Sequence, residues 1–343
     1  MIDLSSDTCT TPTPAMRQAM ASAVVGDEQS GSDPTTSRLC ARLAEMLGQE
    51  DAVLLPSGTM CNLVAAAVHL RPGDEIICAR SAHIYGSEGA GTAVLTGASI
   101  APIESADGTF GIEDVKSMLR PDRARAPSSR LVCVEQTVNR SGGTVWSAGA
   151  LDKLVGFARS TGLNTHMDGA RLFNASVATK TSAETYSKQF NSVWVDLSKG
   201  LGCPVGGVLL GSRDFIAQAW IWKHRLGGAM RQSGVLAAAG LYALDNHIER
   251  LTEDHDNAAL LAHDLSSIEF LKVLNPNPQT NIVLFELSDR EATAEQLRGA
   301  CRARGVQFSI EGTHRLRAVT HLGISEADIR TVVQKVRMAS LGR

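Results

Sequence analysis

The chain has 343 residues, a formal net charge of −3, 43% hydrophobic residues and 20% charged residues. This length exceeds one typical domain and the apolar fraction supports a large core, so we expect two domains. The small net charge, without a long run of one sign, argues against nucleic acid or an anionic membrane surface as a partner. We find neither a secretory leader pattern nor a run of about eighteen apolar residues, so we expect a cytoplasmic protein without a membrane partner.

Seven cysteines are scattered along the sequence, and none forms a C-x-x-C pair. This pattern argues against a disulfide framework and against a zinc knuckle. We expect the thiols to pack as small apolar groups and expect no metal site.

The first elements alternate between helix and strand patterns. Proline in the first turn predicts a helix from about Pro14 to Ala23. Leucines at 39, 43 and 47, spaced by four, predict a helix over residues 35–47 that ends at Gly48. A short strand is predicted over 52–55, and an apolar helix follows the Pro56 turn to about Leu70.

The alternation continues through the middle of the chain. Strands are predicted over residues 75–78, 100–103, 131–135, 164–167, 193–197 and 207–210, with helices such as 88–95, 112–119 and 148–160 between them. Alternation of this kind predicts an α/β fold with a mostly parallel, doubly wound sheet.

The last part of the chain predicts a smaller α+β unit. One long helical segment over residues 235–267 leads into strands at 281–287, 306–310 and 315–320 and helices at 292–304 and 326–339. We therefore divide the chain into a large domain, residues 1–250, and a small C-terminal domain, residues 251–343.

Lys199 is the first candidate for chemistry. It follows an apolar strand pattern and precedes Gly200 and Gly202, which would let a ligand approach closely. A lysine buried at the end of a strand can form a Schiff base. The alternative is an ordinary turn with a solvated lysine.

Asp168 ends another predicted strand about thirty residues before Lys199. A carboxylate there suits the protonated pyridine nitrogen of pyridoxal phosphate, although Asp before Gly169 and Ala170 is also a plain helix cap. The two residues together favour the cofactor hypothesis more than either does alone.

Three further patterns are compatible with a ligand site. Gly58 and Thr59 begin a helix after Ser57, where free N–H groups and the helix dipole suit a phosphate, or where Ser57 simply caps the helix. His83 follows a strand, where ligands bind in open α/β sheets, but a lone histidine is more often a surface residue. Arg315 and Arg317 share one face of a strand and could bind a carboxylate or remain solvated.

Segments distributed over nearly the whole chain together resemble the L-threonine aldolases of the β-eliminating lyase family. They are Ser6-Asp7-Thr8, Gly26-Asp27, Asp33-Pro34-Thr35, Pro56-Ser57-Gly58-Thr59, Ala82-His83, Asp168-Gly169-Ala170-Arg171, Ser198-Lys199-Gly200-Leu201-Gly202, Met230-Arg231-Gln232-Ser233-Gly234 and Arg317-Ala318-Val319-Thr320-His321. The resemblance implies pyridoxal 5'-phosphate as cofactor and the aspartate-aminotransferase fold (fold type I), with a mostly parallel seven-stranded sheet and a smaller C-terminal domain.

The resemblance also implies roles for individual residues. Lys199 would carry the cofactor, Asp168 would hold its pyridine nitrogen protonated, and His83 would stack on its ring. Gly58 and Thr59 would bind the phosphate. Arg231 would reach that phosphate from a neighbouring subunit, because the family forms tetramers with shared active sites; a dimer is the smaller alternative.

The implied substrate is an L-β-hydroxy-α-amino acid such as threonine or allo-threonine, which is cleaved to glycine and an aldehyde. Ser6, Arg171 and Arg317 would bind its α-carboxylate.

Two departures from the family lie at the substrate end. Ser30 stands where relatives carry tyrosine, and Val138 stands where relatives carry a histidine that contacts the substrate hydroxyl. Because Val138 cannot accept a proton, His83 or a bound water would have to act as base. The site should also be roomier, so we expect bulkier substrates of the phenylserine type to be preferred.

Other reactions of the same cofactor remain as alternatives at this stage, namely β-elimination, racemisation, transamination or glycyl transfer to another aldehyde. They would retain Lys199 and Asp168 and differ at the substrate end. A non-catalytic cofactor-binding protein is a weaker alternative, since both of these residues are intact.

Overall fold

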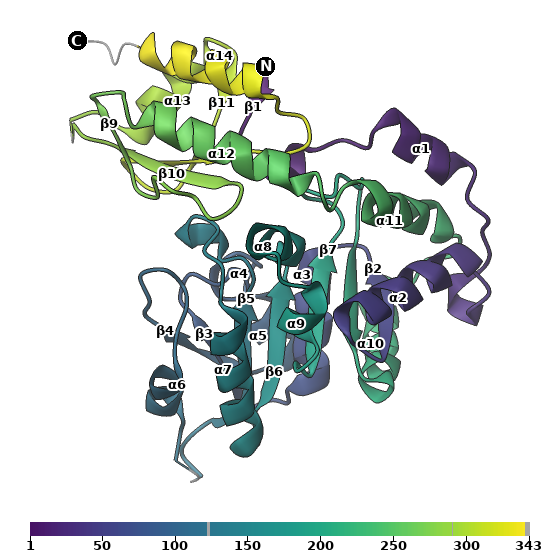
Figure 1. The fold of residues 1–343 in the computed structure, drawn as a ribbon. Coiled ribbons are helices and arrows are strands. Elements are labelled where there is room, and N and C mark those ends of the chain that lie inside the picture. Colours follow the sequence, from purple (N-terminus) through teal and green to yellow (C-terminus); the bar gives the residue numbers. More distant parts are fainter. Residues whose placement is uncertain (122–123, 290, 340–343) are drawn as a thin grey trace.

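The computed structural model describes residues 1–121, 124–289 and 291–339. Its centre is a seven-stranded sheet in the order β2-β8-β7-β6-β5-β3-β4 (Figure 1). The strands are β2 (Asp51–Leu55), β3 (Asp74–Ala79), β4 (Ser99–Ile103), β5 (Ser128–Glu135), β6 (Asn164–Gly169), β7 (Ser192–Asp196) and β8 (Gly207–Gly211). Only β8 runs antiparallel to its neighbours, so the predicted mostly parallel sheet is confirmed.

Helices cover both faces of this sheet, as its continuous apolar strands require. On one face, α3 and α10 enclose a core with side chains from β2, β7 and β8. On the other face, a larger core includes side chains from α2, α7, α8 and α11. The bounds are α1 (Pro14–Ala21), α2 (Pro34–Leu47), α3 (Gly58–His69), α6 (Ile112–Met118), α7 (Ala148–Ser160), α8 (Leu172–Thr179), α9 (Ala183–Ser187), α10 (Arg213–Arg225) and α11 (Gly234–Asn246).

A second, four-stranded antiparallel sheet is built from the C-terminal part of the chain, in the order β12-β13-β10-β9. It packs with three helices around a separate core. The elements are α12 (Leu251–Leu265), β9 (Leu271–Val273), β10 (Ile282–Leu287), α13 (Ala294–Arg302), β11 (Val306–Gln307), β12 (Ser309–Ile310), β13 (Arg315–Val319) and α14 (Glu326–Arg337).

The start of the chain joins this C-terminal unit. The strand β1 (Ile2–Asp3) pairs in parallel with β11, and Leu4 belongs to the core of the C-terminal unit. The N-terminus therefore lies beside α14 (Figure 1). Sequence patterns did not predict β1, because its partner is about 300 residues away and a two-residue strand has no periodicity.

Three predicted elements were wrong in detail. The single helix over 235–267 is two helices, α11 and α12, separated at residues 247–250. His247 caps the end of α11, and its buried imidazole bonds the Leu201 carbonyl. The helix predicted over 88–95 begins only at Gly91, as α5 (Gly91–Thr96), because Ala90 before it has a φ of +56°, and a separate short helix, α4 (His83–Gly86), precedes it. The strand over 306–310 is β11 and β12, which belong to different sheets.

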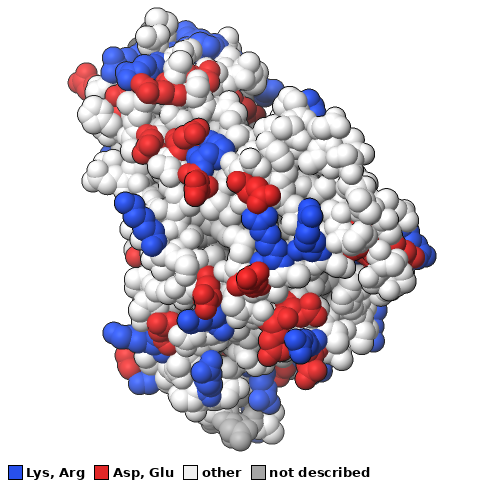
Figure 2. Space-filling model, turned by 45° about the vertical axis from the view of Figure 1, so that its right-hand side comes forward, with Lys and Arg blue, Asp and Glu red and all other residues white. Residues whose placement is uncertain are grey.

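Acidic and basic side chains are interspersed on the face shown in Figure 2, in keeping with the small net charge. Within the described residues, no helix combines the length and the apolar character needed to cross a bilayer.

Candidate active site

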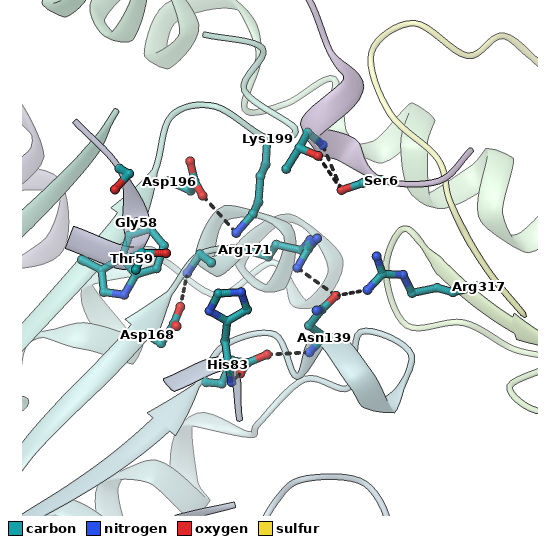
Figure 3. A pocket seen from close by; sticks show the side chains of 15 residues that line it. Ser6, Gly58, Thr59, His83, Asn139, Asp168, Arg171, Asp196, Lys199 and Arg317 are labelled. Carbon is teal, nitrogen blue, oxygen red and sulfur yellow. Dashed lines mark hydrogen bonds and ion pairs between the residues drawn. The ribbon is translucent and has the colours of Figure 1, made fainter. Parts of the chain in front are cut away.

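A pocket of about 280 Å³ lies where the carboxyl ends of β5, β6 and β7 meet the start of α3. Its walls come from the N-terminal segment, the large sheet and β13 of the small sheet (Figure 3). The lining residues are Ser6, Thr8, Ser57, Gly58, Thr59, His83, Glu135, Asn139, Asp168, Ala170, Arg171, Trp194, Asp196, Lys199 and Arg317. Most residues that the sequence predicted for a cofactor and an amino acid therefore share one cavity.

Lys199 follows β7 and points into this pocket with its side chain 18% exposed. Its Nζ lies 2.9 Å from Asp196 Oδ2. The Ser198 N–H and hydroxyl both donate to the other oxygen, Oδ1, each at 2.8 Å. Asp196 is thus fixed by its own turn and holds the lysine amine inside the cavity.

Asp168 ends β6, which is the parallel neighbour of β7, and its side chain faces the same pocket. One carboxylate oxygen accepts a bond of 2.9 Å from the Asn62 amide, and the other accepts 3.1 Å from the Ala170 N–H. The carboxylate is buried and held on both sides, which suits a fixed partner for a cationic ring nitrogen.

The start of α3 forms a third wall. The Ser57 hydroxyl caps the helix by accepting from the Met60 N–H. Among the described residues, none accepts a bond from the N–H of Gly58 or Thr59, so both remain available to an anion. A Cβ at Gly58 would lie 2.2 Å from the Trp194 ring, so the close approach of these elements requires glycine.

His83 begins α4, and its Nδ1 lies 2.7 Å from Glu88 Oε1. This hydrogen bond raises the pKa of His83 above its ordinary value, although partial burial opposes the rise. The other ring nitrogen, Nε2, is not engaged by Glu88 and can exchange a proton. The His83 N–H also donates to Glu135, and burial raises the pKa of that carboxyl to about 6.

Arg171 and Arg317 lie at the far end of the pocket and share Asn139 (Figure 3). Asn139 Oδ1 accepts 2.9 Å from Arg317 and 3.3 Å from Arg171. Asp7 accepts two bonds of 2.7 Å from Arg171. Burial by itself raises the pKa of Asp7, but the Arg171 guanidinium outweighs it and holds that pKa well below its usual range.

Arg317 is freer to meet a ligand than Arg171. Its Nε is buried without a hydrogen-bond partner, whereas all three guanidinium nitrogens of Arg171 are engaged. Arg317 nevertheless has partners besides Asn139: its Nη1 lies 3.3 Å from Glu311 Oε1, and its Nη2 donates to the Ser5 carbonyl at 3.4 Å. Ser6 lies nearby on the N-terminal segment. Arg317, Arg171 and Ser6 together can bind a carboxylate, and Arg317 is the more available cation of the two arginines.

Three predicted site residues do not line the pocket. Val138 is 1% exposed and packs in the main core next to Gly108. Ser30 and Arg231 lie together elsewhere: Arg231 pairs with Asp27 at 2.8 Å, and its side chain is 63% exposed. Within one chain, neither Ser30 nor Arg231 contributes to the cavity.

Several residues that line the pocket or hold its lining were missed by the sequence predictions. Asn62 lies one turn after Gly58 on the same helix face, and Asp196 lies on the Trp194 face of β7, three residues before Lys199. A polar residue in an otherwise apolar element was the available signal in both cases. Asn139 and Glu135 gave no such signal, because their roles depend on contacts with distant residues.

The residues fit pyridoxal phosphate. The free N–H groups at the start of α3 would hold its phosphate, Asp168 its ring nitrogen, and Lys199 its aldehyde carbon. The His83, Glu88 and Asp168 side chains could also gather round a metal ion, but they lie where the cofactor ring would bind.

Comparison with known proteins agrees with this geometry. The family model for beta-eliminating lyases matches residues 3–289. The low-specificity L-threonine aldolase 1 of Arabidopsis thaliana is 39% identical over 99% of this chain and 96% of its own length. The low specificity L-threonine aldolase of Escherichia coli strain K12 is 41% identical over 97% of each chain.

Solved structures give the same fold. Threonine aldolase from Leishmania major superposes with a TM-score of 0.83 at 20% identity, over 99% of this chain and all of that chain. A structure of SPT holding pyridoxal phosphate superposes with a TM-score of 0.75 at 20% identity, over 99% of this chain and 88% of that chain. The fold is therefore fold type I of the pyridoxal-phosphate-dependent enzymes. Within that class, the chain belongs to the beta-eliminating lyase family, as its sequence predicted.

Proposed function

We propose that this protein is a pyridoxal-phosphate-dependent aldolase that cleaves L-β-hydroxy-α-amino acids to glycine and an aldehyde. The observation that carries the proposal is the placement of Lys199, Asp168 and the N–H groups of Gly58 and Thr59 around one cavity whose far end carries Arg171 and Arg317. The relatives named as low-specificity L-threonine aldolases, which match nearly the whole chain, support threonine and allo-threonine as substrates.

The cofactor, once bound to Lys199, would supply an electron sink for the pair released when the Cα–Cβ bond breaks. The protein's part is to bind and orient. Arg317, helped by Arg171 and Ser6, would hold the α-carboxylate, and this fixed end directs the breaking bond relative to the ring. Asp168 would keep the ring nitrogen charged.

His83 is the base in this proposal. Its Nε2 would take the proton from the substrate β-hydroxyl, while Glu88 holds Nδ1 and supports the resulting positive charge. Val138 is buried away from the cavity and cannot carry out this step. The same imidazole would lie over the cofactor ring.

Assembly is a further part of the proposal. We place Arg231 and Ser30 at the active site of a neighbouring subunit in a homotetramer or dimer. Arg231 supports this because it is exposed and outside its own chain's pocket, on a segment that the resemblance assigns to phosphate binding. We also propose a cytoplasmic location, where the seven free thiols would remain reduced.

Product analysis tests the reaction. The purified protein with pyridoxal phosphate is incubated with threonine, allo-threonine and phenylserine, and the products are identified. Aldol cleavage yields glycine and an aldehyde; ammonia and a keto acid would instead show β-elimination and contradict the proposal. We expect kcat/KM to be higher for phenylserine than for threonine, because Ser30 replaces a tyrosine, and a clear preference for threonine would refute that specificity.

A further inference from the structure

A chain of polar side chains runs from the half-buried His69, at the end of α3, through buried residues to Asp168 in the pocket. His69 Nε2 lies 2.7 Å from Ser192 Oγ, and Ser192 Oγ lies 2.8 Å from His166 Nδ1. His166 Nε2 lies 3.1 Å from Asn62 Oδ1, and Asn62 Nδ2 lies 2.9 Å from Asp168 Oδ2. We call these five residues the α3 relay.

The architecture explains why the five residues meet. Asn62 and His69 are seven residues apart, so they lie on one face of α3. His166 and Ser192 are register partners on β6 and β7. The relay therefore lies between α3 and the large sheet, and Asn62, His166 and Ser192 are all buried.

The orientation of the Asn62 amide is fixed from both sides. Its nitrogen faces two carboxylates, Asp168 at 2.9 Å and Glu88 at 2.6 Å, which accept hydrogen bonds. Its oxygen accepts 2.7 Å from the Trp194 indole, which can only donate. Asn62 Oδ1 therefore points towards His166, and the neighbouring Nε2 must carry a proton.

The proton on His166 Nε2 determines where the protons of Ser192 and His69 lie. Because His166 Nε2 donates and the ring is neutral, its Nδ1 must accept from the Ser192 hydroxyl. Ser192 Oγ then accepts from the protonated Nε2 of His69. Every hydrogen bond in the relay is thus donated in the direction of Asp168.

Both histidines are suited to remain neutral. Burial lowers the pKa of His166 to about 3 and that of His69 to about 4. The relay accordingly carries aligned dipoles and no charge, and aligned hydrogen bonds in a low-dielectric interior strengthen one another.

We propose that Ser192, His166 and His69 are positioning residues for Asp168: the relay fixes the Asn62 amide, which holds the Asp168 carboxylate in the orientation that receives the cofactor's ring nitrogen. This inference rests on the proposed function, in which Asp168 binds that nitrogen. It assigns a role to residues that do not touch the pocket.

Replacement of one hydroxyl tests the proposal. Ser192→Ala removes the central link, and Ser187→Ala is the matched control, because Ser187 is equally buried but donates to the Leu47 and Ala183 carbonyls. The dissociation constant for pyridoxal phosphate is measured from its visible absorbance on the protein. We expect Ser192→Ala to weaken cofactor binding about tenfold, as loss of supporting partners does at other sites. Ser187→Ala should leave it within about twofold, and Ser192→Cys, with its weaker donor, should fall between.

Two results would overturn the proposal: cofactor binding in Ser192→Ala equal to that of the unaltered chain, or equal weakening in both alanine variants, which would indicate a general structural loss. Failure of the unaltered chain to take up cofactor would refute the proposed function instead. The relay can then be judged by nitrogen NMR of the cofactor-free chain, with His166→Gln to assign the signals. The relay predicts that His166 carries its proton on Nε2 in the unaltered chain, and that in Ser192→Ala this proton is lost from Nε2 or shared with Nδ1. A proton on Nδ1 in the unaltered chain would refute the relay.

Discussion

Arg171 shows how single side chains of the site depend on partners from distant parts of the sequence. Asp7, near the N-terminus, and Asn139, after β5, hold its guanidinium, and Asn139 also joins it to Arg317 in the small sheet. The charged end of the pocket is thus fixed by a network in which each member positions the next.

Replacement of Asp7 by asparagine should destabilise the protein, because it leaves the Arg171 charge buried and without its counter-ion. We expect the free energy of unfolding at pH 7 to fall by about 3–5 kcal/mol in Asp7→Asn, measured by urea denaturation. Since the pKa of Asp7 is lowered by folding, its contribution is present above its unfolded value of about 4 and is lost as the pH falls below that. The stability difference between the two proteins should therefore begin to narrow below about pH 4 and close only as the pH falls through the lowered folded-state pKa of Asp7. A constant difference throughout would contradict this account.

The proposed base His83 gives a prediction for catalysis. It must be neutral to accept a proton, so kcat/KM should fall as the pH drops through its pKa, which Glu88 raises above the ordinary 6.5. Glu88→Gln should move this acidic limb to lower pH, and His83→Asn should lower kcat by about 10²–10⁴-fold. An acidic limb that stays in place in Glu88→Gln would show that another group is the base.

The helix α3 is the element that connects most of the site. Its first residues offer N–H groups to a phosphate, Asn62 one turn later holds Asp168, and His69 at its end begins the relay. Its start can approach β7 closely only because Gly58 has no side chain against Trp194. A shift of this helix would therefore disturb the phosphate and ring-nitrogen positions together.

Gly58→Ala tests that close approach. The added methyl group would meet the Trp194 ring, so we expect a loss of about 1–3 kcal/mol in unfolding free energy together with weaker cofactor binding. Gly149→Ala in α7 is the matched control, because nothing lies within 4 Å of a Cβ there, and it should be neutral or stabilise by up to about 1 kcal/mol. Equal effects of both substitutions in these assays would refute the packing argument.

At the scale of the whole molecule, the pocket lies where two sheets meet. The large sheet supplies Asp168 and leads into Lys199, the small sheet supplies Arg317, and the N-terminal segment supplies Ser6 after β1 pairs with β11 of the C-terminal unit. Arg231 lies outside this cavity, so the proposed phosphate site is complete only if a second chain supplies that residue.

Mixed assemblies test the shared site. Lys199→Ala and Arg231→Ala are each expected to be poorly active, but subunits that exchange after mixing should form some sites with both native residues and regain activity. Lys199→Ala mixed with Asp168→Asn is the control, because both residues line one chain's pocket and no site can regain both. Differently tagged chains show whether subunits have exchanged. If the mixture of Lys199→Ala and Arg231→Ala has exchanged and is still as inactive as the control, Arg231 acts within its own chain or has no role in the site.

Much of this protein was determined by local sequence. Alternating apolar strands and helices predicted the mostly parallel sheet, and strand-end Asp168 and Lys199, with the glycine at the start of α3, predicted the cofactor pocket. These features depend on residues that are near one another in sequence or at the ends of adjacent parallel strands.

Only the tertiary structure decided the rest. The pairing of β1 with β11, the joining of Arg171 and Arg317 through Asn139, and the donor order from His69 to Asp168 each depend on residues brought together from separate elements. No local periodicity records such contacts, because packing sets the distances between elements and burial then requires each polar group to find a partner.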